Sequence, residues 1–256
     1  MLSYKQLLKK FGVRPFLRKI YRRIFLWRSP NYQQIISLLK DKTGLEVGGP
    51  SSVFGTYLPV YPFIKHLDGC NFSTTTIWEG DIKEGLFFNY GSGTGYQYIL
   101  EATDLSLIKS EYYDFVISAH CLEHIANPLK AVQEWLRVIK NNGLLLLVLP
   151  NKKSCCDHNR DIVAFPHLLQ DYENNVDESD MSHLDEIIEK HDLSMDIIKD
   201  KDQFKKRSLK NFENRCLHHH VFDMNVLEEM FSFFGLETLY KETYRDGHII
   251  IAKKLI

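Results

Sequence analysis

Residues 113–151, YDFVISAHCLEHIANPLKAVQEWLRVIKNNGLLLLVLPN, contain two apolar runs separated by a helical pattern. The first run covers 112–120 and the second covers 143–150. Short continuous apolar runs bounded by turn residues are typical of strands buried on both faces. The order strand, helix, strand therefore predicts a parallel sheet with helices on both of its faces.

The segment between the two runs carries the signals of an amphipathic helix. Asn127 is a suitable N-cap, Pro128 suits the first turn, and Gly143 is a typical stop. The expected buried face consists of four apolar residues at helical spacing: Leu129, Val132, Leu136 and Ile139. We expect this helix to cover the sheet between its two strands.

Weaker signals extend the sheet in both directions along the chain. Residues 44–47 are typical of a strand that runs into two glycines, and 63–73 of a second strand. Towards the C-terminus a helix is expected over 223–235, followed by a hairpin around the Asp246-Gly247 turn. The chain is thus expected to end in an antiparallel pair of strands.

Composition limits the class of protein. The 256 residues are 44% hydrophobic and 12% aromatic, which suits one large domain or one domain with additions. The five cysteines are odd in number and form no C-x-x-C pair, which argues against a disulfide framework and a zinc knuckle. No apolar run reaches the ~18 residues of a spanning helix, and the N-terminus is too basic for a signal peptide. A cytoplasmic protein is expected.

Charge is unevenly distributed along the chain. Residues 1–40 hold ten Lys and Arg and no acid, so all 33 Asp and Glu lie in 41–256. We expect 1–40 to be a basic helical extension packed on the main domain, because Gly12 and Pro15 interrupt its apolar stripe. The alternative is a helix that lies on an anionic membrane or nucleic acid.

Residues 113–151 resemble the fourth-to-fifth-strand region of class I S-adenosylmethionine-dependent methyltransferases of the type 11 kind. The shared features are the apolar strand after Asp114, the LEH tripeptide and the P…L.E..RV.K.GG.L…P pattern. With LEVGGPSS ahead of it, the resemblance covers 43–256, and it extends to the methyltransferases of bacterial surface-polysaccharide biosynthesis. It implies an α/β fold: a Rossmann-like, mostly parallel seven-stranded sheet with an antiparallel C-terminal hairpin, helices on both faces and a helical lid insertion.

Two glycine-rich stretches compete for the role of cofactor loop. EVGGP, which begins at Glu46, directly follows the expected first strand, where a parallel sheet binds its ligand. GSGTG (91–95) precedes no helix, so we expect a loop tip there. The resemblance implies that Glu46 contacts the amino-acid end of S-adenosylmethionine, directly or through water, and that Gly48 and Gly49 line it. Pro50 stands near a family glycine and stiffens the loop.

The resemblance also implies the rest of the cofactor site. Asn71, followed by Phe72, aligns with the acid that holds the ribose, and Asp68 is the nearest substitute; either is equally an ordinary turn residue. Glu101 is expected to accept the adenine amine, with Asp104 as the alternative. Five further residues border the adenine or the methionine end: Ala102, Thr103, Ser118, Ala119 and His120.

The segment that leaves the fifth strand should roof the acceptor pocket. Within it, His158 is the candidate general base and Arg160 the candidate acceptor anchor. His120, at the end of the fourth strand, is a second histidine expected to line the site. The whole of 151–215 is predicted to be a helical lid insertion that binds the acceptor.

Two histidine-containing motifs remain outside this catalytic set. Glu123 and His124 of LEH are family features, but such a pair often only fixes the helix and loop that follow. In RCLHHHVFD (215–223) we expect a strand with His218 and His220 on one face. Neighbouring strand residues point to opposite faces, and no second ligand cluster is apparent, so no metal site is expected.

The resemblance implies an S-adenosylmethionine-dependent methyltransferase, and we expect it to methylate a hydroxyl group of a small molecule or saccharide. A catalytically silent scaffold with the same fold is one alternative, because Pro50 and Asn71 depart from the family pattern. A nucleic-acid methyltransferase is another, although no DPPY or NPPY follows the fourth strand. The enzyme is expected in the cytoplasm. The alternative is a peripheral protein that contacts the inner membrane face through 1–40.

Overall fold

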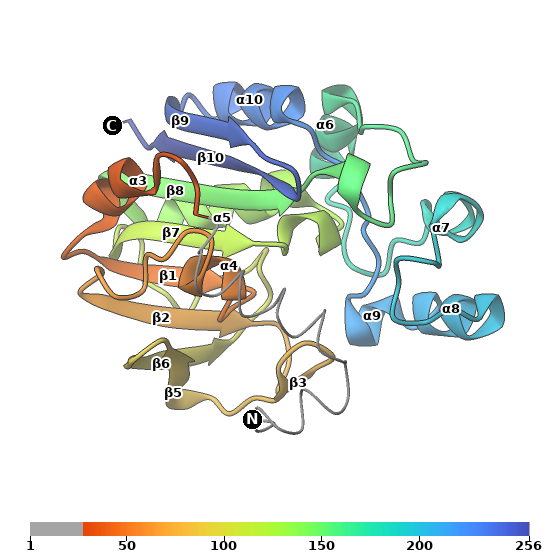
Figure 1. Ribbon diagram of the computed structural model, residues 1–256, viewed down its shortest axis with the longest axis horizontal. Helices are drawn as coiled ribbons and strands as arrows, with labels where there is room; N and C mark the ends of the chain where they lie inside the picture. Colours follow the sequence, from red (N-terminus) through yellow and green to blue (C-terminus); the bar gives the residue numbers. More distant parts are fainter. Residues whose placement is uncertain (1–27, 256) are drawn as a thin grey trace, which may run out of the picture.

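The computed structural model describes residues 28–255, so the basic helix expected within 1–27 lies outside the described part of the chain. Eight strands form one sheet in the order β5-β6-β2-β1-β7-β8-β10-β9 (Figure 1). The five parallel strands are β6 (Gly93–Ile99), β2 (His66–Asn71), β1 (Thr43–Val47), β7 (Tyr113–Ala119) and β8 (Ile139–Pro150). The mostly parallel α/β fold expected from the sequence is confirmed.

The sheet has one strand more than predicted. β5 (Gly85–Tyr90) pairs antiparallel with β6 and forms the edge of the sheet, which makes eight strands rather than seven. The GSGTG stretch spans the turn of this hairpin, which agrees with the loop tip expected there. A separate short hairpin, β3 (Thr75–Thr76) with β4 (Gly80–Asp81), projects beside the end of β2.

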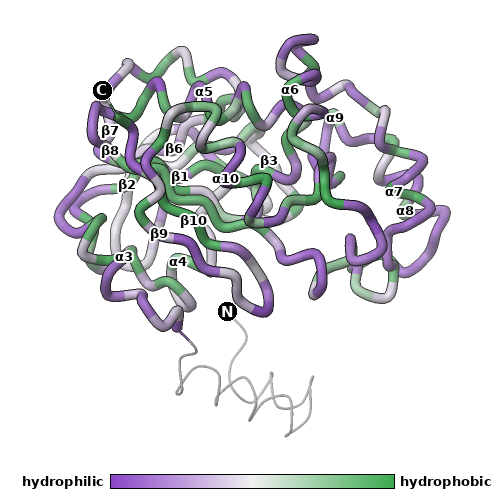
Figure 2. Tube along the Cα trace, turned by 90° about the horizontal axis from the view of Figure 1, so that it is seen from above, coloured by the Kyte–Doolittle hydropathy of each residue, from purple (hydrophilic) through white to green (hydrophobic). Residues whose placement is uncertain are grey.

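Helices cover both faces of the sheet. α5 (Pro128–Val138), α6 (Phe165–Glu173) and α10 (Met224–Phe233) pack on one face, and α3 (Tyr32–Leu39) and α4 (Ser52–Gly55) pack on the other. Figure 2 shows the strands between these layers as the most hydrophobic part of the trace. No helix within residues 28–255 is long and apolar enough to cross a membrane.

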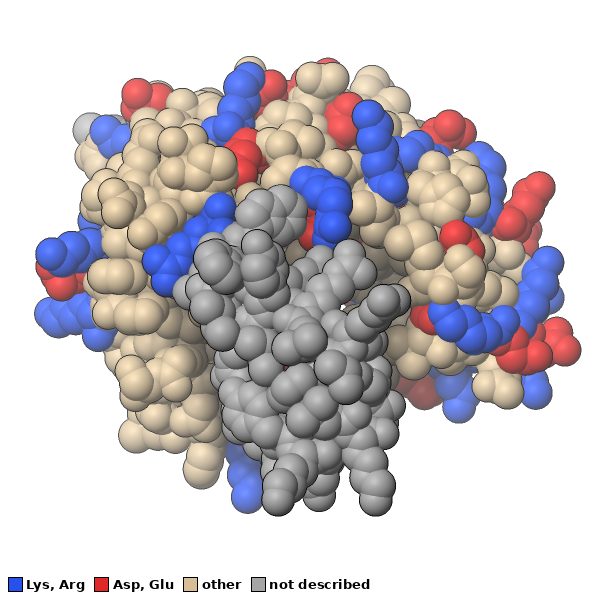
Figure 3. Space-filling model, in the orientation of Figure 1, with Lys and Arg blue, Asp and Glu red and all other residues tan. Residues whose placement is uncertain are grey.

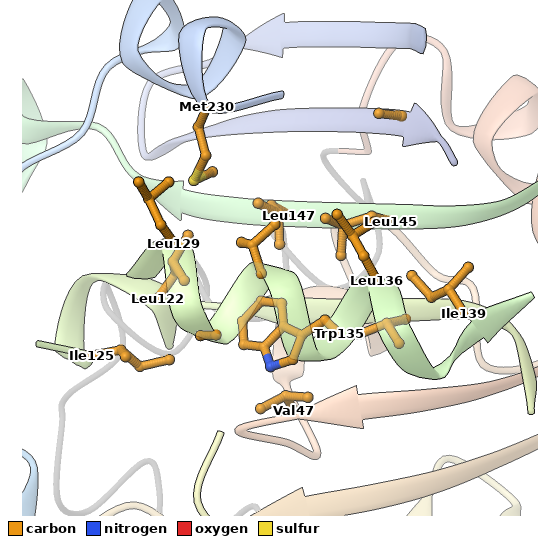
Figure 4. Packing of buried hydrophobic residues seen from close by; sticks show 14 of the residues in the cluster. Val47, Leu122, Ile125, Leu129, Trp135, Leu136, Ile139, Leu145, Leu147 and Met230 are labelled. Atoms are coloured by element: carbon orange, nitrogen blue, oxygen red, sulfur yellow. The ribbon is translucent and has the colours of Figure 1, made fainter. Parts of the chain in front are cut away.

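Helix α5 forms where the sequence predicts it, but it ends earlier. The Asn127 side chain accepts a hydrogen bond from Lys130 N at 3.0 Å, and Trp135 is fully buried against the sheet (Figure 4). The helix ends at Val138 because Ile139 already pairs with Tyr113 as the start of β8. Gly143 is therefore a strand residue, at a point where a Cβ atom would lie 2.7 Å from the Asp114 carbonyl oxygen.

The C-terminal elements agree with the prediction, and one connecting segment does not. α10 is capped by Asp223, and β9 (Glu237–Thr243) and β10 (Gly247–Lys253) form the expected hairpin. Residues 215–223, expected as a strand, form an irregular connection instead. Arg160 holds this segment through bonds to the carbonyl oxygens of His218 and His219, so side-chain bonds replace a strand ladder.

The insertion between β8 and α10 is helical. After the 3-10 turn η2 (Lys152–Ser154) and α6 come α7 (Leu184–Lys190), α8 (Lys201–Ser208) and α9 (Asn211–Asn214). α7 to α9 lie beyond the carboxyl ends of the parallel strands (Figure 1). They share a small core of three buried apolar side chains: Ile187, Phe204 and Leu217.

Candidate functional site

The turn after β1 brings the backbone close to the start of the 3-10 turn η1 (Leu122–His124). Gly48 has a φ of 81°, and a Cβ atom there would lie 2.8 Å from Cys121 Sγ. A Cβ atom on Gly49 would lie 2.2 Å from the Glu46 carboxyl carbon. Both positions therefore need glycine, which gives the EVGGP sequence a steric reason.

Glu46 lies beneath this turn and is fully buried. Its Oε1 accepts a hydrogen bond from Ser51 N at 2.8 Å, and Tyr61 donates its hydroxyl to Oε2 at 2.8 Å. Burial raises the pKa of Glu46 to about 8. The carboxyl group thus anchors the turn from below and does not itself line the pocket, so its contact with the amino-acid end of the cofactor, directly or through water, stays a prediction.

A pocket opens at the carboxyl ends of β1, β2 and β7. Its apolar wall consists of Val47, Cys70, Leu100, Ala102, Cys121 and Ile125. The glycine turn contributes Gly48, and the polar or aromatic lining consists of Asn71, Phe72, Thr76, Trp78, Glu79, Glu101, His120, His124, Glu178 and Arg215. Three carboxylates and one guanidinium among these give the lining a negative balance, which suits a cationic ligand.

Half of the twelve predicted cofactor residues line this pocket: Gly48, Asn71, Phe72, Glu101, Ala102 and His120. Asn71 also donates to the Gly49 carbonyl at 2.9 Å, so it ties β2 to the glycine turn. Its proposed substitute, Asp68, is turned away and accepts bonds from Tyr96 N and the Tyr113 hydroxyl. Asn71 is the better placed of the two.

The other predicted cofactor residues lie beside or behind the pocket. Gly49 and Pro50 line an adjoining groove, and Thr103 lies in an outer groove next to α5. Ser118 is buried and donates to the Val47 carbonyl at 3.0 Å, while Ala119 packs in the core on the opposite face of the sheet. Side chains along β7 point to alternate faces of the sheet, so Ser118 and Ala119 lie on opposite faces and neither enters the pocket. His120 lies just past the end of the strand and does line the pocket.

Neither His158 nor Arg160 is in the pocket. His158 is partly exposed, and its Nε2 lies 3.8 Å from Asp192 within the insertion. Arg160 is 2% exposed and donates to Asp157 and to the 215–223 backbone, so it is a structural residue. The expected general base and acceptor anchor are corrected accordingly: the chain leaving β8 turns away from the pocket mouth.

The pocket includes residues that sequence patterns did not reveal. Thr76, Trp78 and Glu79 come from the β3–β4 hairpin, and Glu178 and Arg215 come from the insertion. The nearest signal was the lone tryptophan in the threonine-rich stretch TTTIWEG. These residues belong to no periodic pattern, and only the tertiary fold brings them together.

His120 lines the pocket, and Glu123 lies behind it. His120 has a φ of 52°, and its Nδ1 lies 3.7 Å from Glu123 Oε1. Glu123 is buried, and neither of its carboxylate oxygens has a hydrogen-bond partner within residues 28–255. Burial acts to raise the pKa of Glu123, but His120, His124 and His218 outweigh it and lower that pKa. A buried carboxylate anion therefore stands behind an imidazole that faces the pocket.

Arg215 connects the insertion to the pocket wall. Its Nη2 lies 2.6 Å from Glu101 Oε1, and its guanidinium carbon lies 5.2 Å from the centre of the Phe72 ring. Nη1 lies 3.9 Å from Glu178, whose pKa is raised by burial to about 7. Two of the predicted cofactor residues are thus held by one arginine from the insertion.

Comparison with known proteins agrees with this geometry. Residues 81–147 match a family model described as a methyltransferase domain. No curated protein matches the chain. The fold is similar to that of an S-adenosylmethionine-dependent methyltransferase from Mesorhizobium loti, with 7% identity, a TM-score of 0.51, and 88% of this chain and 96% of that chain covered. A SAM-dependent methyltransferase from Aquifex aeolicus has 12% identity and a TM-score of 0.46, with both chains fully covered. The domain match supports a methyltransferase whose cofactor is S-adenosylmethionine.

Proposed function

We propose that this S-adenosylmethionine-dependent methyltransferase methylates a hydroxyl group of a saccharide or related small molecule, and that His120 accepts the proton. The observation that carries the proposal is the His120–Glu123 pair at the end of β7, in a pocket with a negative balance.

The pocket residues fit the cofactor. S-Adenosylmethionine supplies a methyl group on a positively charged sulfur, and it carries an ammonium and a carboxylate on its amino-acid end. Glu101 and Glu178 match the cationic groups, and Arg215 offers a guanidinium to a carboxylate. Glu178 Oε2 and Arg215 Nη1 are buried without a hydrogen-bond partner among the described residues, so both can bond to a ligand.

The hairpin side of the pocket suits a hydroxylated acceptor. Trp78 is 51% exposed, and its ring lies 5.1 Å from that of His124. An exposed indole face packs against the C–H face of a sugar ring, while the neighbouring Glu79 carboxylate accepts hydrogen bonds from hydroxyl groups. A flat apolar acceptor has no hydroxyl group to donate to Glu79, so this arrangement does not favour such an acceptor.

The proton has a defined destination. As the acceptor oxygen forms its bond to the methyl carbon and the sulfur–carbon bond breaks, the hydroxyl proton passes to His120. Nδ1 of His120 faces Glu123, so Nε2 is the nitrogen left for the acceptor. The Glu123 anion stabilises the imidazolium that results, as a carboxylate behind a histidine does in other general-base pairs.

Location and partners complete the proposal. The resemblance to surface-polysaccharide enzymes favours a cytoplasmic protein, with peripheral contact to the inner membrane face through the basic N-terminal segment. On the side of the molecule formed by α7 and α8, Lys and Arg are interspersed with Asp and Glu (Figure 3), so this side presents no cationic patch for nucleic acid, and a saccharide partner is favoured. Nucleic-acid binding needs cations gathered on one surface.

The test measures methyl transfer from labelled S-adenosylmethionine to a panel of saccharides, with cofactor affinity measured by calorimetry. His120→Asn is the informative variant, because asparagine tolerates the left-handed backbone at this position. We expect kcat to fall by about 10²–10⁴-fold while the cofactor Kd changes little. His158→Asn is the matched control and should keep full activity.

Three results would contradict the proposal. If the wild-type protein binds no S-adenosylmethionine, the chain is a silent scaffold. If His120→Asn retains full activity, another group removes the proton. If DNA or RNA is methylated and no saccharide is, the acceptor class is wrong.

A further inference from the structure

Three histidines and an aspartate meet outside the pocket, where the insertion folds back on the main domain. One potential ligand atom from each of His167, Asp171, His183 and His220 lies within 4.8 Å of all the others. His167 and Asp171 lie one turn apart on the same face of α6, His183 precedes α7, and His220 lies in the 215–223 connection. The four residues therefore come from three separate segments.

The carboxylate and imidazole groups of this cluster have more acceptor lone pairs than N–H groups to donate to them. Asp171 is 9% exposed, and its Oδ2 is buried without a hydrogen-bond partner within residues 28–255. The Nε2 atoms of His167 and His183 lie 3.1 Å apart, and only one of them can donate to the other. An orphaned buried carboxylate oxygen beside two imidazoles is costly unless a cation binds there.

His220 adds a further unpaired group. Its Nε2 lies 3.2 Å from the Ala126 carbonyl and 3.4 Å from Asp171 Oδ2, while its Nδ1 is buried without a partner in the described part of the chain. Without an ion, Nε2–H can donate to the Ala126 carbonyl and the Nδ1 lone pair stays unpaired. With an ion at Nε2, the ring hydrogen moves to Nδ1 and the Nε2 lone pair becomes the ligand. A neutral imidazole with a free nitrogen lone pair is able to bind a metal ion.

Three of the six distances among these four atoms are close to the spacing around one tetrahedral ion, and all six are within 4.8 Å. Donor atoms about 2.0–2.1 Å from a tetrahedral Zn²⁺ lie about 3.3–3.4 Å from each other. The measured distances are 3.1 Å for His167 Nε2 to His183 Nε2, 3.5 Å for His167 Nε2 to Asp171 Oδ2, and 3.4 Å for His220 Nε2 to Asp171 Oδ2. The donor set of imidazole nitrogen and carboxylate oxygen also suits Zn²⁺ among divalent metals.

We propose that His167, Asp171, His183 and His220 bind a Zn²⁺ ion that fastens the insertion to the main domain. Four protein ligands fill a tetrahedral site, which is the pattern of structural zinc rather than catalytic zinc. The insertion has a reason to need such a fastening, because the core shared by α7, α8 and the adjoining connection is small: three buried apolar side chains with five partly buried ones packed against them. This inference does not depend on the proposed function.

The position of Asp171 is itself fixed from the main domain. Asn127, the N-cap of α5, donates its side-chain amide to the Asp171 carbonyl oxygen at 3.0 Å. The ligands are thus held in place by the helix that covers the sheet, and a metal ion would connect this fixed point to α7 and to the 215–223 connection. Metal binding is therefore expected to order the insertion more than the sheet.

The experiment uses the full-length protein and measures metal binding directly. Protein purified without chelators should contain about one zinc ion per chain by elemental analysis. After removal of the metal with EDTA, Co²⁺ should give the visible absorption bands of a tetrahedral ion, and Zn²⁺ should displace it. Zn²⁺ should also raise the Tm of the stripped protein.

Variants locate the ion. His167→Gln alters the most exposed ligand, and Asp171→Asn keeps the shape of the buried one; each should weaken Co²⁺ binding at least tenfold. His158→Gln, an exposed histidine outside the cluster, should bind Co²⁺ as the wild type does. Circular dichroism of the metal-free variants distinguishes the loss of a ligand from a failure to fold. If His167→Gln does not fold, the Co²⁺ affinity of Asp171→Asn provides the test.

Three outcomes would overturn the proposal. The first is a wild-type protein that takes up neither Zn²⁺ nor Co²⁺ stoichiometrically. The second is a loss of binding in His124→Gln but not in His167→Gln, which would place the ion at Glu123, His124 and His218. The third is a sulfur-to-metal charge-transfer band in the Co²⁺ spectrum, which would place it at Cys156, Asp157 and His218.

Discussion

At the scale of single residues, Glu46 shows that a position can be located from the sequence while its contacts depend on the fold. Its place before the two glycines identifies the turn at which the pocket opens. Alternation along β1 then directs its side chain to the face of the sheet covered by α4, where Ser51 and Tyr61 surround the carboxyl group. Local sequence indicates the turn, but the neighbours that decide the role lie elsewhere in the chain.

The change Glu46→Gln tests this role. The amide keeps an oxygen to accept from Ser51 N, and it removes a buried acid whose pKa burial raises to about 8. We expect S-adenosylmethionine Kd to change by less than about threefold. The wild-type protein should lose stability as the pH rises from about 4.5 to 8, because the unfolded state releases the Glu46 proton first, and Glu46→Gln should not show this loss. Calorimetric titration measures the Kd, and urea unfolding at pH 5 and 8 measures the loss of stability.

The opposite result is also informative. A loss of cofactor affinity of tenfold or more in Glu46→Gln would show that the carboxylate charge reaches the amino-acid end of the cofactor. Asp114→Asn is a suitable control, because Asp114 caps the other end of the sheet through Thr43 N and Lys140.

At the scale of elements, the strands and capped helices could be predicted because their signals are local. The apolar run of β7, the Asn127 cap of α5 and the Asp246-Gly247 turn each act within a few residues. The end of α5 and the 215–223 connection were predicted wrongly because they depend on residues far away in the chain. Ile139 pairs with Tyr113 and so begins β8, and the backbone of 215–223 accepts hydrogen bonds from Arg160 instead of from a neighbouring strand. Tertiary contacts override local propensity at such places.

The same division applies to the site. The glycine turn and His120 follow directly from strand ends, which a sequence pattern can locate. Trp78, Glu178 and Arg215 come from a short hairpin and from an insertion that no general pattern describes. His158 and Arg160 were misplaced because the direction of the chain after β8 depends on Asp157 and His218, which lie 61 residues apart.

The 215–223 connection leads to a prediction about pH. The Asp157 carboxylate and Glu123 outweigh burial and raise the pKa of His218 to about 9. A folded-state pKa above the unfolded value contributes stability that is full below about pH 6.5 and is lost as the pH rises through 9. We expect the free energy of unfolding to fall by about 2–3 kcal/mol between pH 6.5 and 9.5 from this residue.

The comparison of His218→Gln with the wild type isolates this contribution. The variant should be less stable at pH 6.5, and its unfolding free energy should fall less steeply towards pH 9.5 in urea titrations. His158→Gln should keep the wild-type slope, since its ring is partly exposed and 3.8 Å from Asp192. Equal slopes in wild type and His218→Gln would show that the His218–Asp157 pair does not titrate in this range.

At the scale of the whole molecule, the protein consists of a sheet domain whose pocket is completed by the insertion. The parallel strands supply the floor of the pocket, and the insertion supplies Glu178 and Arg215. Arg215 is the direct link, because it pairs with Glu101 and lies over Phe72 on the sheet side and over Phe212 of α9 on its own side. Ligand binding and insertion order should therefore be coupled.

The change Arg215→Gln tests the coupling. Glutamine removes the charge and the planar group that stacks on Phe72, while it keeps a side chain that can donate hydrogen bonds. We expect S-adenosylmethionine affinity to fall by about tenfold, and amide hydrogen exchange across 174–215 to be faster, with β7 and β8 unaffected. Lys241→Gln, which breaks an exposed ion pair with Glu228 between β9 and α10, should change neither quantity. Two other results would contradict the coupling, because Arg215 contacts both the insertion and the pocket wall. Weaker cofactor binding with unchanged hydrogen exchange would mean that the arginine acts on the ligand alone. Faster hydrogen exchange with unchanged cofactor binding would mean that the pocket does not need an ordered insertion.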